Sequence, residues 1–310
     1  MEDDKYAKEL DVAVRVVHMA CSLCQRVQEG LVSASSDQVK SKVDDSPVTI
    51  ADWSVQATVS WILSEFFGSQ NVSIIAEEDV ETLSKADSVG LLQAVVNTVN
   101  ECLAGAPKYG LKSPSKALTP SQILEAISRC NSIGGPKGRH WVLDPVDGTL
   151  GFVRGDQYAV ALALVEDGKV VIGWGGVDAA THSGDKNFEW PNSAKLIRVS
   201  SIDDPALATS CEPVEKANSN HSFTEGLAHS VGLRKKPMRV YSMVKYAAIA
   251  RGDAELFMKF ARSGYKEKYG IMLRGSYLEG LDRGIIVCSG ATLHEKIIDA
   301  VYASWDSSNL

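Results

Sequence analysis

The sequence lacks any long apolar run. A helix that spans a bilayer needs about 18 to 20 consecutive apolar residues, and no stretch of the 310 residues approaches that length. The N-terminal residues 1–5 are acidic and lack the apolar segment of a signal peptide. We therefore expect no membrane partner and a cytoplasmic location, with an organellar one still open.

An excess of positive charge is also lacking. The 32 Lys and Arg residues are outnumbered by 39 Asp and Glu residues, which gives a formal net charge of −7. Surfaces that bind nucleic acid attract the phosphate backbone through clustered basic side chains, so we exclude nucleic acid as a partner. A small phosphorylated substrate is compatible with this charge if metal ions, backbone N–H groups or a few cations neutralise it locally.

The six cysteines are few and mostly scattered, which predicts free thiols in a reducing compartment. Cys21 and Cys24 have the spacing of redox and zinc motifs. However, the pair lies within a helical pattern, and no second ligand pair accompanies it. We expect two buried or half-buried helix residues.

Apolar spacing in the first half predicts helices and an antiparallel sheet. Helices are predicted over residues 6–31, 49–67, 91–103 and 121–130, and strands over 71–76, 140–143, 158–165 and 169–177. The last two strands flank a tight-turn signal, Glu166-Asp167-Gly168, which implies antiparallel pairing. The Gly, Pro, Ser and Lys content of residues 105–120 predicts a surface loop.

The second half alternates short strands with helices, which predicts an α/β layer. Strands are predicted over 196–199, 239–241, 256–258 and 284–288, and helices over 223–231, 244–252 and 292–304. A polar stretch over 181–192 suggests a domain junction. The predicted domains are therefore 1–190, a metal-binding α+β domain, and 191–310, a shortened α/β domain.

The segment Asp144-Pro145-Val146-Asp147-Gly148-Thr149 follows an apolar strand and carries the chemistry. Phosphoryl transfer needs a nucleophilic water and neutralised phosphate oxygens, and carboxylates that hold Mg²⁺ supply both. Pro145 stiffens the turn, so that Asp144, the Val146 carbonyl and Asp147 can face one point. Gly148 lets the backbone approach an oxyanion closely.

This hexapeptide resembles that of the lithium-sensitive inositol monophosphatase superfamily. Segments 46–52, 75–79 and 134–158, and more weakly 241–246, are similar to the plant-type 3′(2′),5′-bisphosphate nucleotidases. The resemblance implies a layered α-β-α-β-α sandwich and a Mg²⁺-dependent phosphatase of sulfur metabolism. Its implied reaction converts adenosine 3′,5′-bisphosphate to AMP and phosphate, and some relatives also remove the 1-phosphate of inositol polyphosphates.

The resemblance also implies residue roles. The metal ligands would be Glu77, Asp144, the Val146 carbonyl and Asp147. Asp52 with Thr149 would orient and deprotonate the attacking water. The substrate would be held by the N–H groups of Gly148 and Thr149 and, at its nucleotide end, by Ser242 and Lys245.

Each role has a structural alternative. Asp52 falls near a helix start, where a carboxylate can cap free N–H groups without any catalytic role. The acidic run that begins at Glu77 could be a solvated charged surface, although its place after a buried strand favours a ligand. Ser242 and Lys245 could be ordinary surface residues.

One part of the family pattern is missing. Relatives carry a W-D-x-A-A-G-type segment whose Asp is a further metal ligand, whereas residues 264–280 here run from before that motif to after it. Leu150 stands where relatives have Lys, and Asn218 where they have His. The predicted C-terminal part is therefore depleted, and the alternative function is a catalytically weakened or inactive relative.

Overall fold

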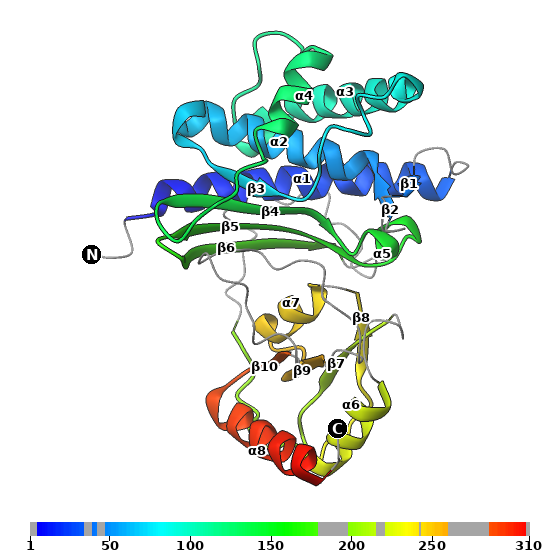
Figure 1. Cartoon of the computed structure of the whole chain (residues 1–310), viewed down its shortest axis with the longest axis vertical. Coiled ribbons are helices and arrows are strands. Elements are labelled where there is room, and N and C mark those ends of the chain that lie inside the picture. Colours follow the sequence, from blue (N-terminus) through cyan, green and yellow to red (C-terminus); the bar gives the residue numbers. More distant parts are fainter. Residues whose placement is uncertain are drawn as a thin grey trace. The chain divides into compact units, whose positions relative to one another are not determined.

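The computed structural model describes residues 5–33, 39–41, 47–178, 198–214, 221–241, 243–259 and 285–307. The chain divides into two compact units. The first comprises residues 1–186 and 272–275, and the second comprises residues 187–271 and 276–310. Each unit is described by itself (Figure 1).

Two long helices form the centre of the first unit. Helix α1 spans Ala7–Ser33 and helix α2 spans Ile50–Phe67, close to the predicted ranges. Thr49 caps the start of α2, and Gly68 ends it with a φ of 80°. Helices α3 (Val89–Ala104) and α4 (Pro120–Ser128) pack on α2, so α2 is covered on several sides and buries most of its residues.

A four-stranded mixed sheet lies against α1 and α2 in the order β3-β4-β5-β6. Its strands are β3 (Ile74–Ala76), β4 (Arg139–Asp147), β5 (Tyr158–Glu166) and β6 (Lys169–Asp178). Strands β4, β5 and β6 pair antiparallel, and β5 turns into β6 through Asp167 and Gly168, both at positive φ. The predicted hairpin and its pairing are confirmed.

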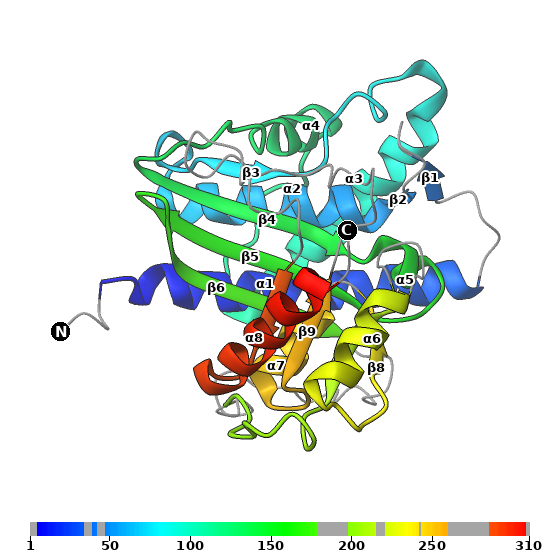
Figure 2. The same cartoon turned by 60° about the horizontal axis from the view of Figure 1, so that its bottom comes forward.

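Short elements complete the first unit. Strands β1 (Val39–Ser41) and β2 (Pro47–Thr49) pair antiparallel, and helix α5 spans Thr149–Val153. Single 3₁₀ turns occupy Ser69–Asn71, Ala86–Ser88 and Ala106–Tyr109. The loop over residues 105–120 lies mostly on the surface, as predicted, and buries Ala106, Leu111 and Leu118 in the main core. Figure 2 shows the unit from another side.

The second unit has its own mixed sheet in the order β10-β9-β7-β8. The strands are β7 (Ser210–Pro213), β8 (Met238–Val240), β9 (Leu256–Lys259) and β10 (Ile285–Cys288). The helices are α6 (His221–Val231), α7 (Val244–Arg251) and α8 (Ala291–Ser307). Their alternation confirms the predicted α/β layer, except that β7 was not predicted and the described residues of the expected strand at 196–199 form none.

The cysteine thiols and the apolar character of the helices bear on two expectations from the sequence. Every cysteine is a free thiol, with Cys21 half-buried and Cys24 buried on α1. None of the described helices combines the length and the apolar character that crossing a membrane requires.

Candidate active site

A bulge in β4 brings Asp144 and Asp147 to one face of the sheet. Residues three apart on a regular strand point to opposite faces. Here Asp144 pairs with Ala161 and Asp147 with Ala159, so three steps along β4 match two steps along β5. Because Ala161 and Ala159 share a face, their two partners share it as well. The bulge falls at Pro145 and Val146, and Pro145 has no N–H to lose from the ladder.

The parallel pairing of β3 with β4 places Glu77 beside this bulge. Ala76, the last residue of β3, pairs with Leu143, so the next residues along the two strands are Glu77 and Asp144. Glu77 follows the carboxyl end of β3, and Asp144 lies in the carboxyl-terminal half of β4, so both are near the edge where sites gather in α/β sheets. Glu77 is exposed, whereas the next residue, Glu78, is only 4% exposed.

The contacts of Asp52 fit both interpretations drawn from the sequence, a helix cap and a catalytic carboxylate. Its Oδ2 atom accepts hydrogen bonds from Thr49 N at 2.8 Å and Thr49 Oγ1 at 2.7 Å, which completes a capping box at the start of α2. Its Oδ1 atom lies 3.5 Å from the donor Thr149 Oγ1. The side chain is 2% exposed, so the cap holds a buried carboxylate toward the bulge loop.

Thr149 is the first residue of α5 and follows Gly148. Gly148 has a φ of 93°, in the left-handed region that disfavours residues with a Cβ atom. Thr149 Oγ1 donates to the Val146 carbonyl at 3.0 Å, which is shorter than its contact with Asp52. The turn therefore links the Val146 carbonyl, one of the expected ligands, to the side chain expected to orient water.

Like charges gather around Asp144. Burial raises the pKa of its carboxyl group well above the usual 3.8. Neighbouring carboxylates raise that pKa further, in the order Asp147, Glu77, Asp52 and Glu78. Asp144 Oδ1 is buried and accepts no hydrogen bond from the described residues. A buried oxygen without a donor, surrounded by negative charge, is the environment that a hard cation stabilises.

The residues fit such a cation in chemistry, because carboxylates and a backbone carbonyl are the oxygen ligands that Mg²⁺ prefers. Within the described ranges, no group of three or more His, Cys, Asp or Glu side chains lies close enough together to hold a metal ion as it stands.

The two side chains expected at the nucleotide end, Ser242 and Lys245, belong to the second unit. Ser242 lies outside the described residues, as do Asn218 and the segment 264–280. Lys245 belongs to the second unit, where it is 6% exposed. Its Nζ atom donates to the Val240 carbonyl at 3.5 Å and lies 5.3 Å from the centroid of the Phe257 ring.

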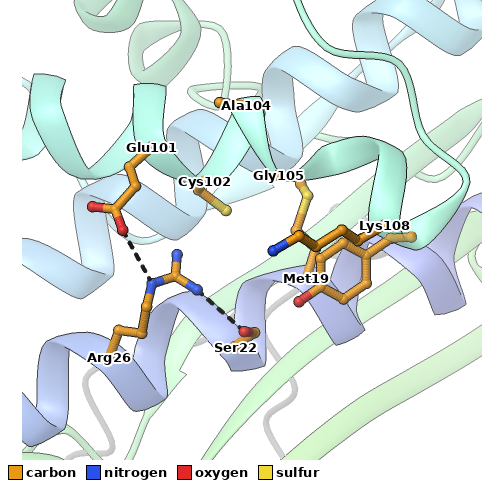
Figure 3. A pocket seen from close by; sticks show the side chains of 9 residues that line it. Met19, Ser22, Arg26, Glu101, Cys102, Ala104, Gly105 and Lys108 are labelled. Carbon is orange, nitrogen blue, oxygen red and sulfur yellow. Dashed lines mark hydrogen bonds and ion pairs between the residues drawn. The ribbon is translucent and has the colours of Figure 1, made fainter. Parts of the chain in front are cut away.

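A pocket of about 410 Å³ lies elsewhere in the first unit, between α1 and α3 (Figure 3). Arg26 at its edge forms an ion pair with Glu101 at 3.7 Å and a hydrogen bond to Ser22 at 3.2 Å. Cys102 also lines it, and burial raises the pKa of that thiol to about 11, which leaves it protonated and unreactive at neutral pH. None of the expected site residues lines this pocket.

Two side chains near the site were not predicted. Glu78 contributes a buried negative charge, and Gln56 of α2 bonds to its backbone. Glu78 could have been found from the strand register, because it directly follows Glu77, which lies beside Asp144. No local pattern marks Gln56, because its partners lie 22 and 71 residues away in the chain.

Known proteins resemble this chain over its whole length. The model of the inositol monophosphatase family matches residues 13–269. The 3′,5′-bisphosphate nucleotidase AHL of Arabidopsis thaliana is 57% identical over 373 residues, covering 100% of both chains. The 3′(2′),5′-bisphosphate nucleotidase 1 of the same plant is 38% identical, covering 85% of this chain and 80% of its own.

A solved structure supports the fold. An IMPase from Thermotoga maritima matches with a TM-score of 0.55 at 17% identity, and the match covers 97% of this chain and 99% of the other. The alignment with the AHL protein has 373 positions against 310 residues here, so at least 63 of them have no counterpart in this chain.

Proposed function

The chain belongs to the inositol monophosphatase family, and we propose that it is a Mg²⁺-dependent 3′,5′-bisphosphate nucleotidase. It hydrolyses adenosine 3′,5′-bisphosphate to AMP and phosphate. The observation that carries the proposal is the bulge that turns Asp144 and Asp147 to one face beside Glu77. The 57% identity to a 3′,5′-bisphosphate nucleotidase supports the substrate class.

Mg²⁺ would be held by Glu77, Asp144, Asp147 and the Val146 carbonyl, and it would supply charge neutralisation and an acidified water. Thr149 Oγ1 turns its single proton from the Val146 carbonyl to Asp52 Oδ1 and accepts a hydrogen bond from the attacking water. As the water oxygen bonds to phosphorus, its proton passes through Thr149 to Asp52. The bond between phosphorus and the ester oxygen breaks, and that oxygen leaves with its electron pair and takes a proton from a solvent water to become a hydroxyl group of AMP. The 3.5 Å separation between Thr149 and Asp52 would shorten once substrate is bound.

Phosphate release from adenosine 3′,5′-bisphosphate, measured with and without Mg²⁺, tests this proposal. Asp144→Ala serves as the inactive control. We expect Mg²⁺-dependent release by the wild type, and release no higher than that of the control would refute the enzyme. A parallel measurement with inositol 1,4-bisphosphate compares the two substrate classes under the same conditions.

A second candidate is a weakened or inactive relative. It is favoured by the 63 or more alignment positions that this chain lacks and by the missing W-D-x-A-A-G-type segment. Losing one carboxylate lowers the charge available to a second cation. This candidate predicts that nucleotide binds by calorimetry with turnover far below that of the AHL protein. Turnover equal to that of the AHL protein would exclude it.

A further inference from the structure

The segment that carries Glu77 is fastened to the helix that carries Asp52. Gln56, one turn after Asp52 on α2, donates from Nε2 to the Glu78 carbonyl at 2.7 Å and accepts from Glu78 N at 3.0 Å through Oε1. One side-chain amide therefore binds both backbone groups of a single residue. Such a paired contact fixes the orientation of the peptide as well as its position.

The same amide has a third bond. Gln56 Nε2 also donates to the Ile127 carbonyl at 3.3 Å, at the end of α4. Both Nε2 hydrogens and the Oε1 atom are thus engaged, and the side chain is 0% exposed. A buried amide with its donors and acceptor satisfied has one orientation only.

A second side chain of α2 extends this attachment. Trp53 Nε1 donates to the Asp79 carbonyl at 3.0 Å, and Trp53 is 2% exposed. Asp79 Oδ1 in turn accepts from Glu81 N at 2.8 Å, which closes the turn after the acidic run. The backbone on the carboxyl side of Glu77 is therefore held by α2, and its amino side by pairing with β4.

We propose that Gln56 is a positioning residue that fixes Glu77 beside Asp144 and thereby sets the affinity of the carboxylate cluster for a divalent cation. This inference rests on the proposed function, because it takes Glu77 as a metal ligand. Gln56 itself touches neither metal nor substrate and acts through the Glu78 peptide. Residues that orient ligands in this way typically change metal affinity when they are removed.

The paired contact of a side-chain amide with both backbone groups of one residue, here called a clamp, occurs a second time in the chain and provides a matched control. Asn100 of α3 donates from Nδ2 to the Leu118 carbonyl at 2.9 Å and accepts from Leu118 N at 2.7 Å. It is the same amide-to-peptide pair, yet Leu118 lies in the loop over residues 105–120, which contributes no expected ligand. Gln56→Met and Asn100→Leu each remove one such clamp and keep the shape of the side chain.

The experiment measures Mn²⁺ binding to the full chain by electron paramagnetic resonance, and denaturant stability in the presence of EDTA. We expect the apparent Kd for Mn²⁺ to rise about tenfold to a hundredfold in Gln56→Met. Asn100→Leu should lose stability and keep the wild-type Kd. An unchanged Kd in Gln56→Met, or the same rise in both variants, would overturn the inference.

The enzyme activity of Gln56→Met provides a measurement that is independent of Mn²⁺ binding. The phosphate release of Gln56→Met should recover when the Mg²⁺ concentration is raised, whereas a loss that persists at saturating Mg²⁺ contradicts a positioning role. If Gln56→Met does not fold, Trp53→Phe removes the Nε1 donor together with part of the ring and should raise the Kd in the same direction, beyond the effect of its lost stability on the EDTA measurement. A wild type that binds Mn²⁺ without releasing phosphate refutes the proposed function, while the Mn²⁺ comparison still decides the role of Gln56.

Discussion

Among the described residues, the buried apolar side chains of the two units cluster differently. In the first unit, one continuous cluster joins α1, α2, α3, α4 and the β3–β6 sheet, and the carboxylates lie at its edge. In the second unit, the described cluster is small, and other buried side chains such as Val244 and Phe257 lie outside it. The cluster consists of Ala208, Leu227, Leu256, Met258, Leu293, Ile297 and Val301. The unit with the large core can hold a buried acid in unfavourable surroundings, because stability elsewhere offsets that local cost.

Asp144→Asn should have the largest effect, because it should lower the enzyme activity while it raises the stability of the metal-free fold. The side chain keeps its size and loses the charge that a cation needs. A bound metal ion supplies several kcal/mol of transition-state stabilisation, so phosphate release should fall about 10³-fold or more. The raised pKa of Asp144 means that its charged form destabilises the metal-free fold at neutral pH. The urea midpoint measured in EDTA should therefore rise, and a fall in that midpoint would contradict the proposed cluster of like charges.

Equivalent cavities in the two cores would compare the units directly. Ile62 on α2 and Ile297 on α8 are both 0% exposed. We expect Ile62→Ala to cost about 4 kcal/mol and Ile297→Ala about 2 kcal/mol, because a small core collapses more readily around a cavity. Native-state hydrogen exchange measures the loss of unfolding free energy in each unit separately. Equal losses, or the reverse order, would show that the small core is packed as firmly as the large one.

The bulge loop can be tested through its glycine. Gly148→Ala places a Cβ atom at a φ of 93°, which should cost about 1–2 kcal/mol of stability. Phosphate release should fall as well, because the loop would shift Thr149 away from Asp52. A melting curve and a steady-state assay check both effects, and Gly90→Ala, whose added Cβ meets no atom within 4 Å, provides the control. Full activity in Gly148→Ala would show that the loop geometry is dispensable.

Most of the helices could be predicted from apolar periodicity, because their amphipathic faces are local properties of the chain. The candidate site was predictable as a set of residue types, and Pro145 predicted that Asp144 and Asp147 face one point. The sequence predicted a turn there, however, and only the pairing of β4 with β5 shows that a bulge within a strand brings the two residues to one face. The clamp from Gln56 depends on contacts between distant segments, which leave no local pattern.

One strand that was not predicted and three buried residues in a predicted surface loop have the same physical origin. Strand β7 reads Ser-Cys-Glu-Pro, which has little strand propensity, and its pairing with β8 and β9 determines its conformation. The loop over residues 105–120 has surface composition, yet Asn100 holds it so that Leu118 is buried. In both cases tertiary contacts outweigh composition.

The smallest expected effect concerns the far end of the first unit, where Glu166 joins β5 to the start of α1. Glu166 accepts hydrogen bonds from Tyr6 Oη, from Lys5 Nζ at 2.9 Å and from Arg139 Nε at 3.1 Å. These donors, Tyr6 first, lower the pKa of Glu166 from 4.5 to about 2. A lowered pKa in the folded state stabilises the fold above the ordinary value, and that stabilisation is lost as the pH falls through the folded value.

The stabilisation from Glu166 should therefore be complete above about pH 4.5 and disappear progressively toward pH 2. In Glu166→Gln, the part of the acid-induced loss of stability that falls in this window should be absent, while the rest of the pH profile is kept. Urea midpoints of the wild type and the variant at half-unit pH steps measure the difference. Because the group is partly exposed at the surface, added salt should shrink the difference, which would distinguish this network from the buried carboxylates around Asp144. An identical profile for both proteins would mean that Glu166 does not contribute measurably to the pH dependence of stability.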